Sequence, residues 1–262
     1  MMVLKKGKTG LHQGKIYIVS TPIGNLEDIT LRALRVLKEV GLIAAESREH
    51  TKKLCRYYDI RTPVTSYNSH NQRYKGGVLL KKVKSGLDIA LVSDAGTPGL
   101  SDPGFRLLRE AIDADIKLVP VPGVSASLTA LSVSGLPIDR FVFTGFLSNK
   151  KGRRRKELEG LKLEYRTMIF FESPHRLINM LTDVYEIMGN RYIVLAKEMT
   201  KMFEDIKRGP VKEILSAIED KEIKGEYTII AEGLREPSRN AHFVDKKDYI
   251  ITYEELWKRS DV

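Results

Sequence analysis

The sequence of 262 residues has a single cysteine and no long apolar run. Cys55 alone cannot form an internal disulfide, which excludes a disulfide framework and suits a reducing compartment. The longest apolar runs, such as 16–19 and 168–171, fall far short of the roughly 18 residues that a membrane span needs. Residues 1–15 are basic and contain no apolar core, so they do not resemble a secretory signal. We therefore expect a cytoplasmic protein with no membrane segment.

The histidines provide no recognisable metal site. Their spacing along the chain, to one another and to Cys55, matches no set of metal ligands. We therefore expect no bound metal, and packing is the simplest role for Cys55. The histidines are His12, His50, His70, His175 and His242.

Acidic residues are few relative to basic ones, with 34 Asp and Glu against 44 Lys and Arg and a net charge of +10. A basic surface attracts polyanions and speeds their approach. Many basic soluble proteins bind no nucleic acid, so charge alone leaves an RNA or DNA partner open. The remaining composition, 42% hydrophobic and 30% charged, is that of a globular protein.

Short apolar runs alternate with amphipathic stretches, which is the pattern of an α/β fold. We predict strands near 15–19, 42–45, 89–93, 117–121, 141–146, 168–172, 192–197, 204–208 and 227–231. One helix is predicted to begin at Asp28 as its N-cap. Further helices are predicted near 47–57, 71–84, 105–114, 125–134, 153–161, 175–187 and 211–219.

The composition changes near Leu136 and Pro137, just before a predicted strand, and we place a domain boundary there. This gives an N-terminal α/β domain of residues 1–136 and a C-terminal α/β domain of residues 137–233. The polar tail, 234–262, has no clear partner strand, although residues 253–259 have the pattern of a short helix.

A loop rich in glycine and proline, residues 94–104, follows the predicted strand 89–93 directly. Ligands of open α/β sheets bind at the carboxyl ends of the strands, where such loops gather. The glycines permit positive φ angles and a close approach of the backbone to a ligand. Asp94 and Asp102 are suited to accept hydrogen bonds from a ribose or an amine. The spacing matches neither a dinucleotide-binding motif nor a P-loop, and the alternative role is an ordinary connection.

Two other strand ends have similar loops, residues 19–26 and 121–127. In the second of these, Ser125 can simply cap the following helix. Because all three loops leave the same end of one predicted sheet, together they predict a single pocket.

Several segments of the chain resemble the tetrapyrrole methylase superfamily of S-adenosylmethionine-dependent enzymes. The resemblance runs from about residue 14 to residue 233. It rests on the segments Tyr17–Ile29, Ala44–Arg48, Ser93–Gly104, Pro120–Ala126, Phe171–Arg176, Ala196–Glu204 and Lys224–Tyr227.

The resemblance implies two α/β domains with S-adenosylmethionine in the cleft between them. It is strongest to members that methylate the ribose 2′-hydroxyl of a cytidine in the decoding region of 16S rRNA, within the small ribosomal subunit. It also implies a homodimer. Where members that act on tetrapyrroles usually carry a Gly-Gly-Asp-Pro loop, this chain has Asp94–Gly99, which argues against a tetrapyrrole substrate.

Matching each motif position by position implies a set of cofactor contacts. Backbone groups on rigid loops can hold the adenine, ribose and amino acid parts of such a cofactor. The implied contacts are Pro22, Asp94, Ala95, Gly96, Thr97, Pro98, Leu100, Ser101, Ser125, Ala126, Phe171, Glu198 and Tyr227.

Methylation of a hydroxyl requires alignment of the two reactants and removal of a weakly acidic proton. In or beside the matching motifs, the candidates for the base are Glu46, Asp94, His175, Lys197 and Glu198. Arg48, Arg176 and Lys201 are candidates for the phosphates beside the target. Simpler roles remain open, because His175 can open a helix and Glu46 can pair with Arg48.

The tract 150–156 holds six cations in seven residues: Lys150, Lys151, Arg153, Arg154, Arg155 and Lys156 surround one glycine. Cations at a helix start oppose the helix dipole, which favours phosphate binding over a solvated surface. Tyr57, Tyr58, Tyr67 and Tyr74 flank basic residues and can stack on bases, but half-buried core tyrosines are commoner.

Two alternatives to an rRNA methyltransferase remain open from the sequence. One is a methyltransferase of the same superfamily that acts on a tetrapyrrole or a protein, which the charge of +10 disfavours. The other is an RNA-binding relative that has kept the fold without catalysis. Cofactor binding and the identity of the methylated product separate these alternatives.

Overall fold

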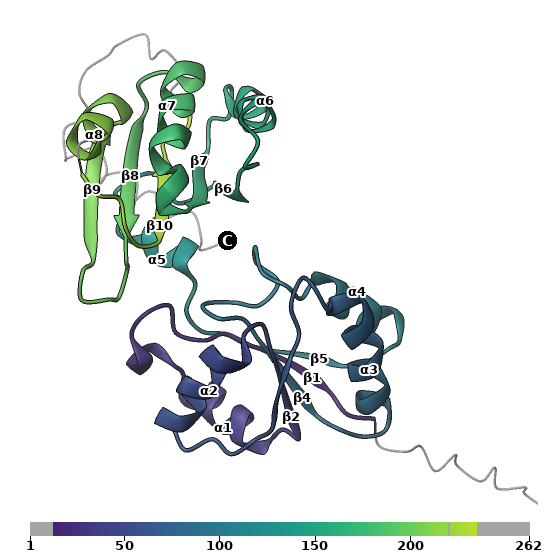
Figure 1. Ribbon diagram of the computed structural model, residues 1–262. Coiled ribbons are helices and arrows are strands. Elements are labelled where there is room, and N and C mark those ends of the chain that lie inside the picture. Colours follow the sequence, from purple (N-terminus) through teal and green to yellow (C-terminus); the bar gives the residue numbers. More distant parts are fainter. Residues whose placement is uncertain (1–12, 220, 235–262) are drawn as a thin grey trace, which may run out of the picture.

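A computed structural model describes residues 13–219 and 221–234 of the chain. They form two five-stranded sheets, each covered by helices, one above the other in Figure 1. The predicted α/β class is confirmed. The predicted helix at 253–259 and almost all of the expected tail lie outside the described residues.

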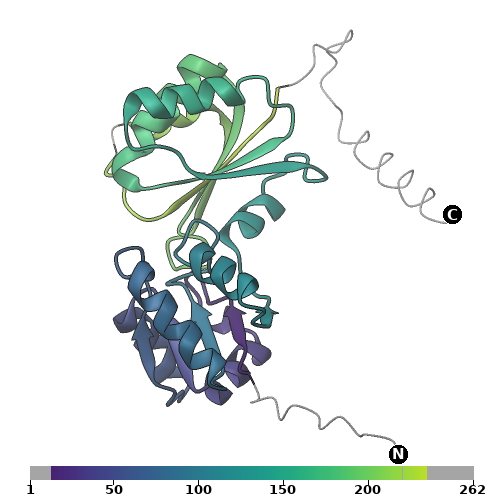
Figure 2. The same cartoon turned by 90° about the vertical axis from the view of Figure 1, so that its right-hand side faces the viewer.

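The first sheet has the strand order β3-β2-β4-β1-β5, and all its strands run parallel. Because the strands are parallel, their carboxyl ends lie at one edge of the sheet, and this edge faces the second sheet (Figures 1 and 2). The strands are β1 (Ile16–Val19), β2 (Leu42–Ala45), β3 (Val64–Ser66), β4 (Ile89–Val92) and β5 (Leu118–Val121).

Helices cover both faces of the first sheet, so its strands are apolar on both sides. Along β2, Ile43 and Ala45 pack under α1 (Leu31–Glu39) and α2 (Arg48–Tyr57). The intervening Ala44 packs on the opposite face with residues of α3 (Gln72–Lys84) and α4 (Phe105–Asp113). Each large aliphatic side chain buried in this way stabilises the fold by roughly 1.5–3 kcal/mol.

The second sheet is mixed, with the order β6-β7-β10-β8-β9. β6 and β7 are parallel, whereas β10 runs antiparallel to both β7 and β8, and β8 antiparallel to β9. The strands are β6 (Phe141–Phe146), β7 (Thr167–Glu172), β8 (Tyr192–Lys197), β9 (Asp205–Pro210) and β10 (Tyr227–Ala231).

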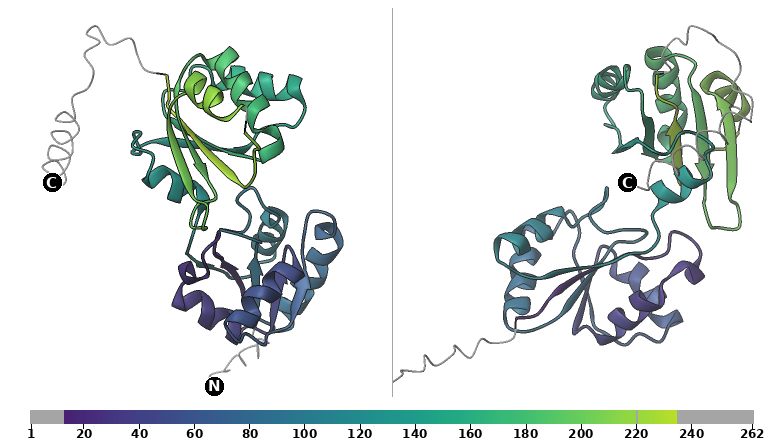
Figure 3. Two further views of the ribbon diagram at one scale, coloured as in Figure 1. Left: turned by 60° about the vertical axis from the view of Figure 1, so that its left-hand side comes forward. Right: turned by 180° about the vertical axis from the view of Figure 1, so that it is seen from behind.

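One face of the second sheet is covered by α6 (Lys151–Leu161), α7 (Leu177–Met188) and α8 (Val211–Ile218). The other face packs on α5 (Ala126–Ser132), which lies at the junction of the two halves of the molecule (Figures 1 and 3). Thus α5, which precedes the boundary expected at residue 136, packs with the C-terminal half. The boundary itself stays a prediction.

Three local features differ from the sequence predictions. Strand β3 was not predicted, because it has only three half-buried residues at the edge of the sheet. Thr30, not Asp28, caps α1: its hydroxyl accepts a hydrogen bond from the Ala33 N–H, whereas Asp28 ends the short 3-10 helix η1 (Leu26–Asp28). Ser125 occupies the N-cap position of α5 but makes no capping hydrogen bond with its side chain.

None of the helices in the described part of the chain has the length and apolar character needed to cross a bilayer.

Candidate functional site

The three loops that follow β1, β4 and β5 meet at the carboxyl edge of the first sheet, as predicted. Thr21 and Gly96 exchange two backbone hydrogen bonds of 2.9 Å each, which tie the first loop to the second. The hydroxyls of Ser20 and Thr97 are 2.9 Å apart, and the Thr97 hydroxyl also donates to the Val124 carbonyl. These bonds fix all three loops relative to one another before any ligand binds.

The conformation of the loop after β4 depends on its glycines. Gly96 and Gly99 have φ angles of 75° and 84°, and Gly104 has 154°, as the predicted need for positive φ requires. Ser101 also has a positive φ, 67°, which is costly for a residue with a β-carbon. Such strain is found most often at binding sites, where the surrounding structure holds it.

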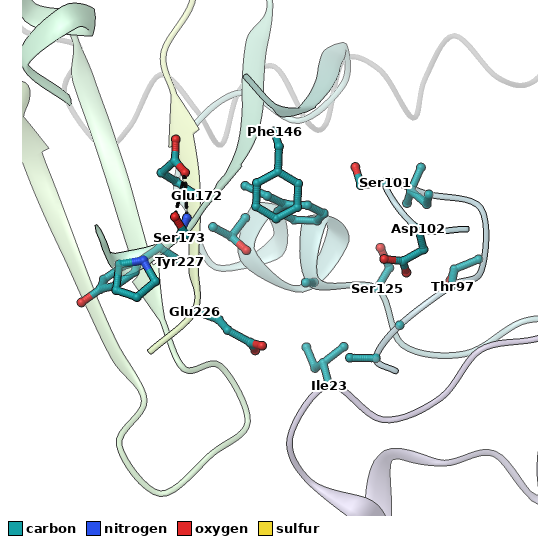
Figure 4. Close-up of a pocket in the computed structure, with 17 residues that line it drawn as sticks. Ile23, Thr97, Ser101, Asp102, Ser125, Phe146, Glu172, Ser173, Glu226 and Tyr227 are labelled. Carbon is teal, nitrogen blue, oxygen red and sulfur yellow. Dashed lines mark hydrogen bonds between the residues drawn. The ribbon is translucent and has the colours of Figure 1, made fainter. Parts of the chain in front are cut away.

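A cavity of about 360 Å³ lies between the loops of the first sheet and the carboxyl end of β7 in the second sheet. We call it the central cavity (Figure 4). From the first half it is lined by Ile23, Ala95, Gly96, Thr97, Leu100, Ser101, Asp102, Ser125 and Ala126. From the second half it is lined by Phe146, Phe171, Glu172, Ser173, Pro174, Glu226, Tyr227 and Thr228.

Aromatic rings form one wall of the central cavity. Phe146 and Phe171 have ring centroids 5.6 Å apart, and Phe143 packs edge-on to Phe171 at 5.2 Å. Phe146 is 55% exposed even though it is a large apolar residue. An exposed ring that packs against a second ring, as Phe146 does against Phe171, is suited to pack against a flat ligand group.

Glu172 places a buried carboxylate in the same cavity. Its Oε1 accepts a hydrogen bond of 2.8 Å from the Ser173 N–H and lies 3.1 Å from Nε of Arg176. Its Oε2 is buried and has no hydrogen-bond partner. A buried carboxylate oxygen left without a partner is costly, so this atom is an acceptor available to a ligand donor.

Glu46, which follows β2, forms an acidic cluster with Asp94 and Asp102 of the loop after β4. Glu46 accepts a hydrogen bond of 3.3 Å from the Asp94 N–H, and Asp94 accepts one of 2.9 Å from the Ser47 N–H. Burial, and to a smaller extent repulsion from Glu46, raises the pKa of the Asp102 carboxyl to about 6. Burial also raises the pKa of Glu46.

Two further cavities adjoin the central one. The α2 cavity, about 650 Å³, lies between the loop after β1 and α2, and shares Ile23, Ala95 and Glu226 with the central cavity. The α4 cavity, about 410 Å³, lies beside the start of α4 and shares Ser101 and Asp102 with it. The acidic cluster therefore lines all three cavities: Asp102 lines the central cavity, Asp94 the α2 cavity, and Glu46 and Asp102 the α4 cavity.

A second contact joins the two halves beside the α2 cavity. The Asn25 N–H donates to the Thr200 hydroxyl at 3.1 Å. A β-carbon on Gly24 would lie 2.4 Å from Cγ of Lys201, so only glycine fits there without movement. Lys201 is in turn bonded to Glu198 and Glu226 at 2.9 and 2.8 Å.

Most of the residues predicted to contact a cofactor line the central cavity. Pro22 and Asp94 lie instead in the α2 cavity, and Pro98 and Glu198 do not line the cavities described above. Whether these residues bind a cofactor stays a prediction. Those in the central cavity are Ala95, Gly96, Thr97, Leu100, Ser101, Ser125, Ala126, Phe171 and Tyr227.

None of the candidates Glu46, His175, Lys197 and Glu198 lines the central cavity, although Lys197 and Glu198 are neighbours in the chain. Glu46 lines the α4 cavity within the acidic cluster. Glu198, with a φ of 48°, is bonded to Lys201 and to the Glu226 N–H; although burial raises its pKa, these bonds lower the pKa below the ordinary value. His175 is exposed in the 3-10 helix η2 (Pro174–Arg176), and Lys197 lies in a separate small cavity with Asp205.

The predicted basic tract divides into two sets on α6. Arg154 is buried, and its guanidinium forms hydrogen bonds with Asp183 on α7. Arg155 bonds to Asp183 as well and to Glu186. The prediction that these two arginines bind phosphate is corrected: they hold α6 on α7, which also offsets their unfavourable place at a helix start. Lys150, Lys151, Arg153 and Lys156 are exposed.

The other predicted phosphate ligands differ in whether their cationic groups are already paired within the protein. Arg48 is exposed at the start of α2. Arg176 is bound to the Leu147 carbonyl at 2.6 Å and lies against Glu172, so it supports the central cavity from behind. Lys201 is held by its two glutamates but still lines the α2 cavity.

Several lining residues were missed at the level of sequence. Glu172, Ser173 and Pro174 stand in the quoted motif Phe171–Arg176, and Glu226 stands in Lys224–Tyr227, so a signal was present for these. Asp102 was noted as an acceptor but not as a cofactor contact. Ile23, Phe146 and Thr228 had no distinct signal, because their place depends on how the two halves meet. Among the described residues, no group of His, Cys, Asp and Glu is arranged to hold a metal ion.

Comparison with known proteins gives a family match over most of the chain. The model of the tetrapyrrole (corrin/porphyrin) methylases matches residues 15–215.

Curated relatives of high identity share one name, ribosomal RNA small subunit methyltransferase I. The protein from Escherichia coli O157:H7 is 49% identical over 224 residues, covering 84% of this chain and 78% of its own. That from Halalkalibacterium halodurans is 47% identical over 221 residues, covering 84% and 76%. That from Thermotoga maritima is 46% identical over 220 residues, covering 84% and 99%.

Solved structures share the fold at much lower identity. Uroporphyrin-III C-methyltransferase from Thermus thermophilus, complexed with S-adenosylhomocysteine, aligns with a TM-score of 0.61 at 17% identity, over 84% of this chain and 97% of its own. Diphthine synthase aligns with a TM-score of 0.64 at 14% identity, over 84% and 90%.

Proposed function

Because the chain belongs to the tetrapyrrole (corrin/porphyrin) methylase family, we propose that it is an S-adenosylmethionine-dependent methyltransferase of small-subunit ribosomal RNA. The observation that supports this most is the name shared by relatives 46–49% identical over 84% of the chain. The net charge of +10 suits a polyanionic acceptor.

We propose further that the acceptor is the ribose 2′-hydroxyl of a cytidine in the decoding region of 16S rRNA, as the motif resemblance implies. Such an enzyme works in the cytoplasm on the small ribosomal subunit. We also propose that it forms a homodimer, which light scattering of the purified protein at micromolar concentration tests directly.

The central cavity fits S-adenosylmethionine in its chemistry. This cofactor carries a sulfonium and an ammonium group, and three carboxylates, Asp102, Glu172 and Glu226, line the cavity. The unpartnered Oε2 of Glu172 gives a donor such as the ammonium or a ribose hydroxyl a place to bind. The rings of Phe146 and Phe171 suit the adenine. We propose that these groups and the backbone of 95–97 hold the cofactor.

When bound, the cofactor supplies a methyl group made electrophilic by its sulfonium. Transfer of this methyl group to the acceptor oxygen would release S-adenosylhomocysteine and the hydroxyl proton, so this chain would have to align the two reactants and provide an acceptor for the proton. The rigid, cross-linked loops around Thr21, Gly96 and Thr97 contribute by fixing the position of the donor, because alignment can supply several kcal/mol of a displacement barrier.

The hydroxyl proton requires an acceptor, and the acidic cluster is the group best placed to receive it. Glu46 is the catalytic candidate that we retain, because its carboxyl belongs to the cluster and its pKa is raised toward the working range of a base. We do not propose Glu198 as the base, because its carboxylate is bonded to Lys201. His175 and Lys197 are not proposed as the base, because neither lines the central cavity, the α2 cavity or the α4 cavity.

The exposed cations of the basic tract, together with Arg48, are proposed contacts to the RNA backbone. Each such contact displaces condensed counterions, so the affinity is expected to fall steeply with salt. The exposed members of the tract are Lys150, Lys151, Arg153 and Lys156.

The test is a methyl-transfer assay with radiolabelled S-adenosylmethionine, using purified 16S rRNA and 30S subunits that lack the modification. We expect label in the RNA and resistance to alkaline cleavage at one ribose. Transfer to neither substrate over a range of salt concentrations would falsify the proposal. Cofactor binding without such transfer would favour a tetrapyrrole or protein acceptor, and no cofactor binding would favour an RNA-binding relative without catalysis.

A further inference from the structure

The α2 cavity is larger than the central cavity, about 650 Å³ against about 360 Å³, and of the groups proposed to hold the cofactor only Ala95 and Glu226 line it. It adjoins the central cavity through Ile23 and Ala95, which line both. A molecule in the α2 cavity would therefore lie next to whatever occupies the central cavity. A methyl acceptor needs such a position.

One face of α2 supplies the outer wall of the α2 cavity. His50, Lys53 and Tyr57 recur at intervals of three and four residues, which places their side chains on the same face of a helix. Lys52 and Arg56 fall on other faces and do not line the cavity. The order of residues in α2 thus directs basic and aromatic groups to the cavity.

The basic groups of this wall are available to a ligand. Among the residues that the structure describes, the ammonium of Lys53 makes no ion pair, whereas the neighbouring Lys52 lies 3.7 Å from Glu49. His50 is exposed and contributes only its backbone N–H to the cap of α2. A free cation at a cavity mouth is suited to a phosphate or a carboxylate.

The aromatic group is equally available. Tyr57 is 64% exposed, and its ring is packed edge-on by Tyr58 with centroids 4.8 Å apart at 78°. Tyr58 is itself anchored by its hydroxyl, which donates to the Leu26 carbonyl at 2.6 Å. An anchored ring with an open face is the usual platform for a nucleobase.

We propose that the α2 cavity receives a single unpaired nucleotide of the RNA acceptor, with its base on Tyr57 and an adjacent phosphate on Lys53 and His50. This assignment rests on the proposed function and specifies where its acceptor binds. A nucleotide within a duplex cannot enter such a cavity, so the target is single-stranded or turned out of its helix. Asp94, which lines the same cavity, brings the acidic cluster to the nucleotide.

The experiment compares Tyr57→Ala, Tyr57→Phe and Lys53→Ala with the matched control Lys52→Ala, which removes the same charge from the outer face of α2. For each, kcat/KM for methyl transfer to 30S subunits and the cofactor Kd by calorimetry are measured. We expect Tyr57→Ala and Lys53→Ala each to lower kcat/KM on the order of tenfold, as loss of base stacking or a phosphate contact does.

Tyr57→Phe keeps the ring and is expected to retain activity within about threefold of the wild type. Cofactor Kd is expected to stay within about twofold for all variants, since none of them changes the central cavity. Lys53→Ala is also expected to lower the salt slope of RNA binding by roughly 0.7, the value for one contact to a single strand.

The outcomes separate the two proposals. If the wild type methylates RNA while Tyr57→Ala and Lys53→Ala behave like Lys52→Ala, the assignment of the α2 cavity is overturned and the proposed function stands. If these variants lose cofactor affinity instead, the cavity belongs to the cofactor and the assignment is likewise overturned. If the wild type methylates a tetrapyrrole rather than RNA, both proposals fail together.

Discussion

The hydroxyl oxygen of Ser101 lies 2.6 Å from the point where a β-carbon on Gly145 would be. Ser101 belongs to the loop after β4, and Gly145 lies at the irregularity where the register of β6 against β7 shifts. The two halves of the molecule therefore touch at the edge of the central cavity, and they do so where one of them has no side chain.

Gly145→Ala is expected to weaken cofactor binding on the order of tenfold or more, because the new methyl group displaces Ser101 from the cavity edge. The matched control is Gly135→Ala. Gly135 has a similar φ, 74° against 68°, but nothing within 4 Å of an added β-carbon. Both variants should lose stability by about 1–3 kcal/mol from backbone strain, and calorimetry should find the loss of cofactor affinity only for Gly145→Ala. Equal cofactor affinity in both would refute the role of this contact.

Asp102→Asn tests the raised pKa in the central cavity. The carboxyl titrates near pH 6 in the folded chain against an ordinary value of 3.8, so the folded state favours the protonated form. Wild-type stability should therefore fall as the pH rises from about 4 to above 6, relative to the variant, which has no charge to bury. Thermal melts should show Asp102→Asn the more stable of the two at pH 8, by about 1 kcal/mol or less after allowance for solvent screening, and equal to the wild type near pH 3.

The same substitution should act in the opposite direction on the cofactor. If the Asp102 carboxylate pairs with a cationic group of the ligand, Asp102→Asn weakens binding at neutral pH, and the wild type binds less tightly below pH 6. Calorimetric titrations from pH 5 to pH 8 measure both effects. A wild-type affinity independent of pH over this range would contradict a direct contact.

Arg154→Met is expected to destabilise the fold by up to about 3–5 kcal/mol, because it removes the buried one of the two guanidinium groups that pair with the buried carboxylate of Asp183. Arg153→Ala, one position earlier on α6 and exposed, should change stability by no more than about 0.5 kcal/mol. Urea unfolding separates the two. Arg153→Ala should instead lower RNA affinity at low salt, and a stability loss shared by both variants would show that α6 is held otherwise.

Glu46→Gln is expected to lower kcat for methyl transfer on the order of 100-fold while leaving cofactor affinity within about threefold. Glu49→Gln, on the exposed turn of α2, is the control and should retain full activity. In the wild type, kcat should decline as the pH falls toward the raised pKa of Glu46, because protonation removes the base. An unchanged kcat in Glu46→Gln would transfer this role to another member of the acidic cluster.

The sequence predicted strands and loops well where several residues repeat one signal. The glycines of the loop 94–104 predicted positive φ angles, and Gly96, Gly99 and Gly104 have positive φ in the structure. By contrast, β3 could not be foreseen, because three residues at a sheet edge carry no usable periodicity. The sequence predicts Asp28 as the N-cap of α1, but the N-cap is Thr30. Both residues are good caps and lie two positions apart, and only the 3-10 helix η1, which Asp28 ends, decides between them.

Charge along the chain was a poorer guide than apolar pattern. Six cations in the tract 150–156 predicted a phosphate surface, yet Arg154 and Arg155 are occupied by Asp183, which is 28 to 29 residues away. Phe146 and Ile23 line the central cavity, but no sequence motif predicted this, because their position depends on contacts between the two halves. Contacts between residues far apart in the sequence depend on the folded chain, so the local spacing of residues does not predict them.

The link between Thr21 and Gly96 joins two loops through backbone atoms alone. These two bonds use no side-chain atom, so they do not depend on which side chain stands at position 21, although the Thr21 hydroxyl also donates to the Ser93 carbonyl at 3.2 Å. Natural selection can therefore exchange the side chains that face an acceptor while the donor site keeps its form. Divergence of acceptor preference on a constant scaffold becomes a matter of a few surface substitutions, without a new fold.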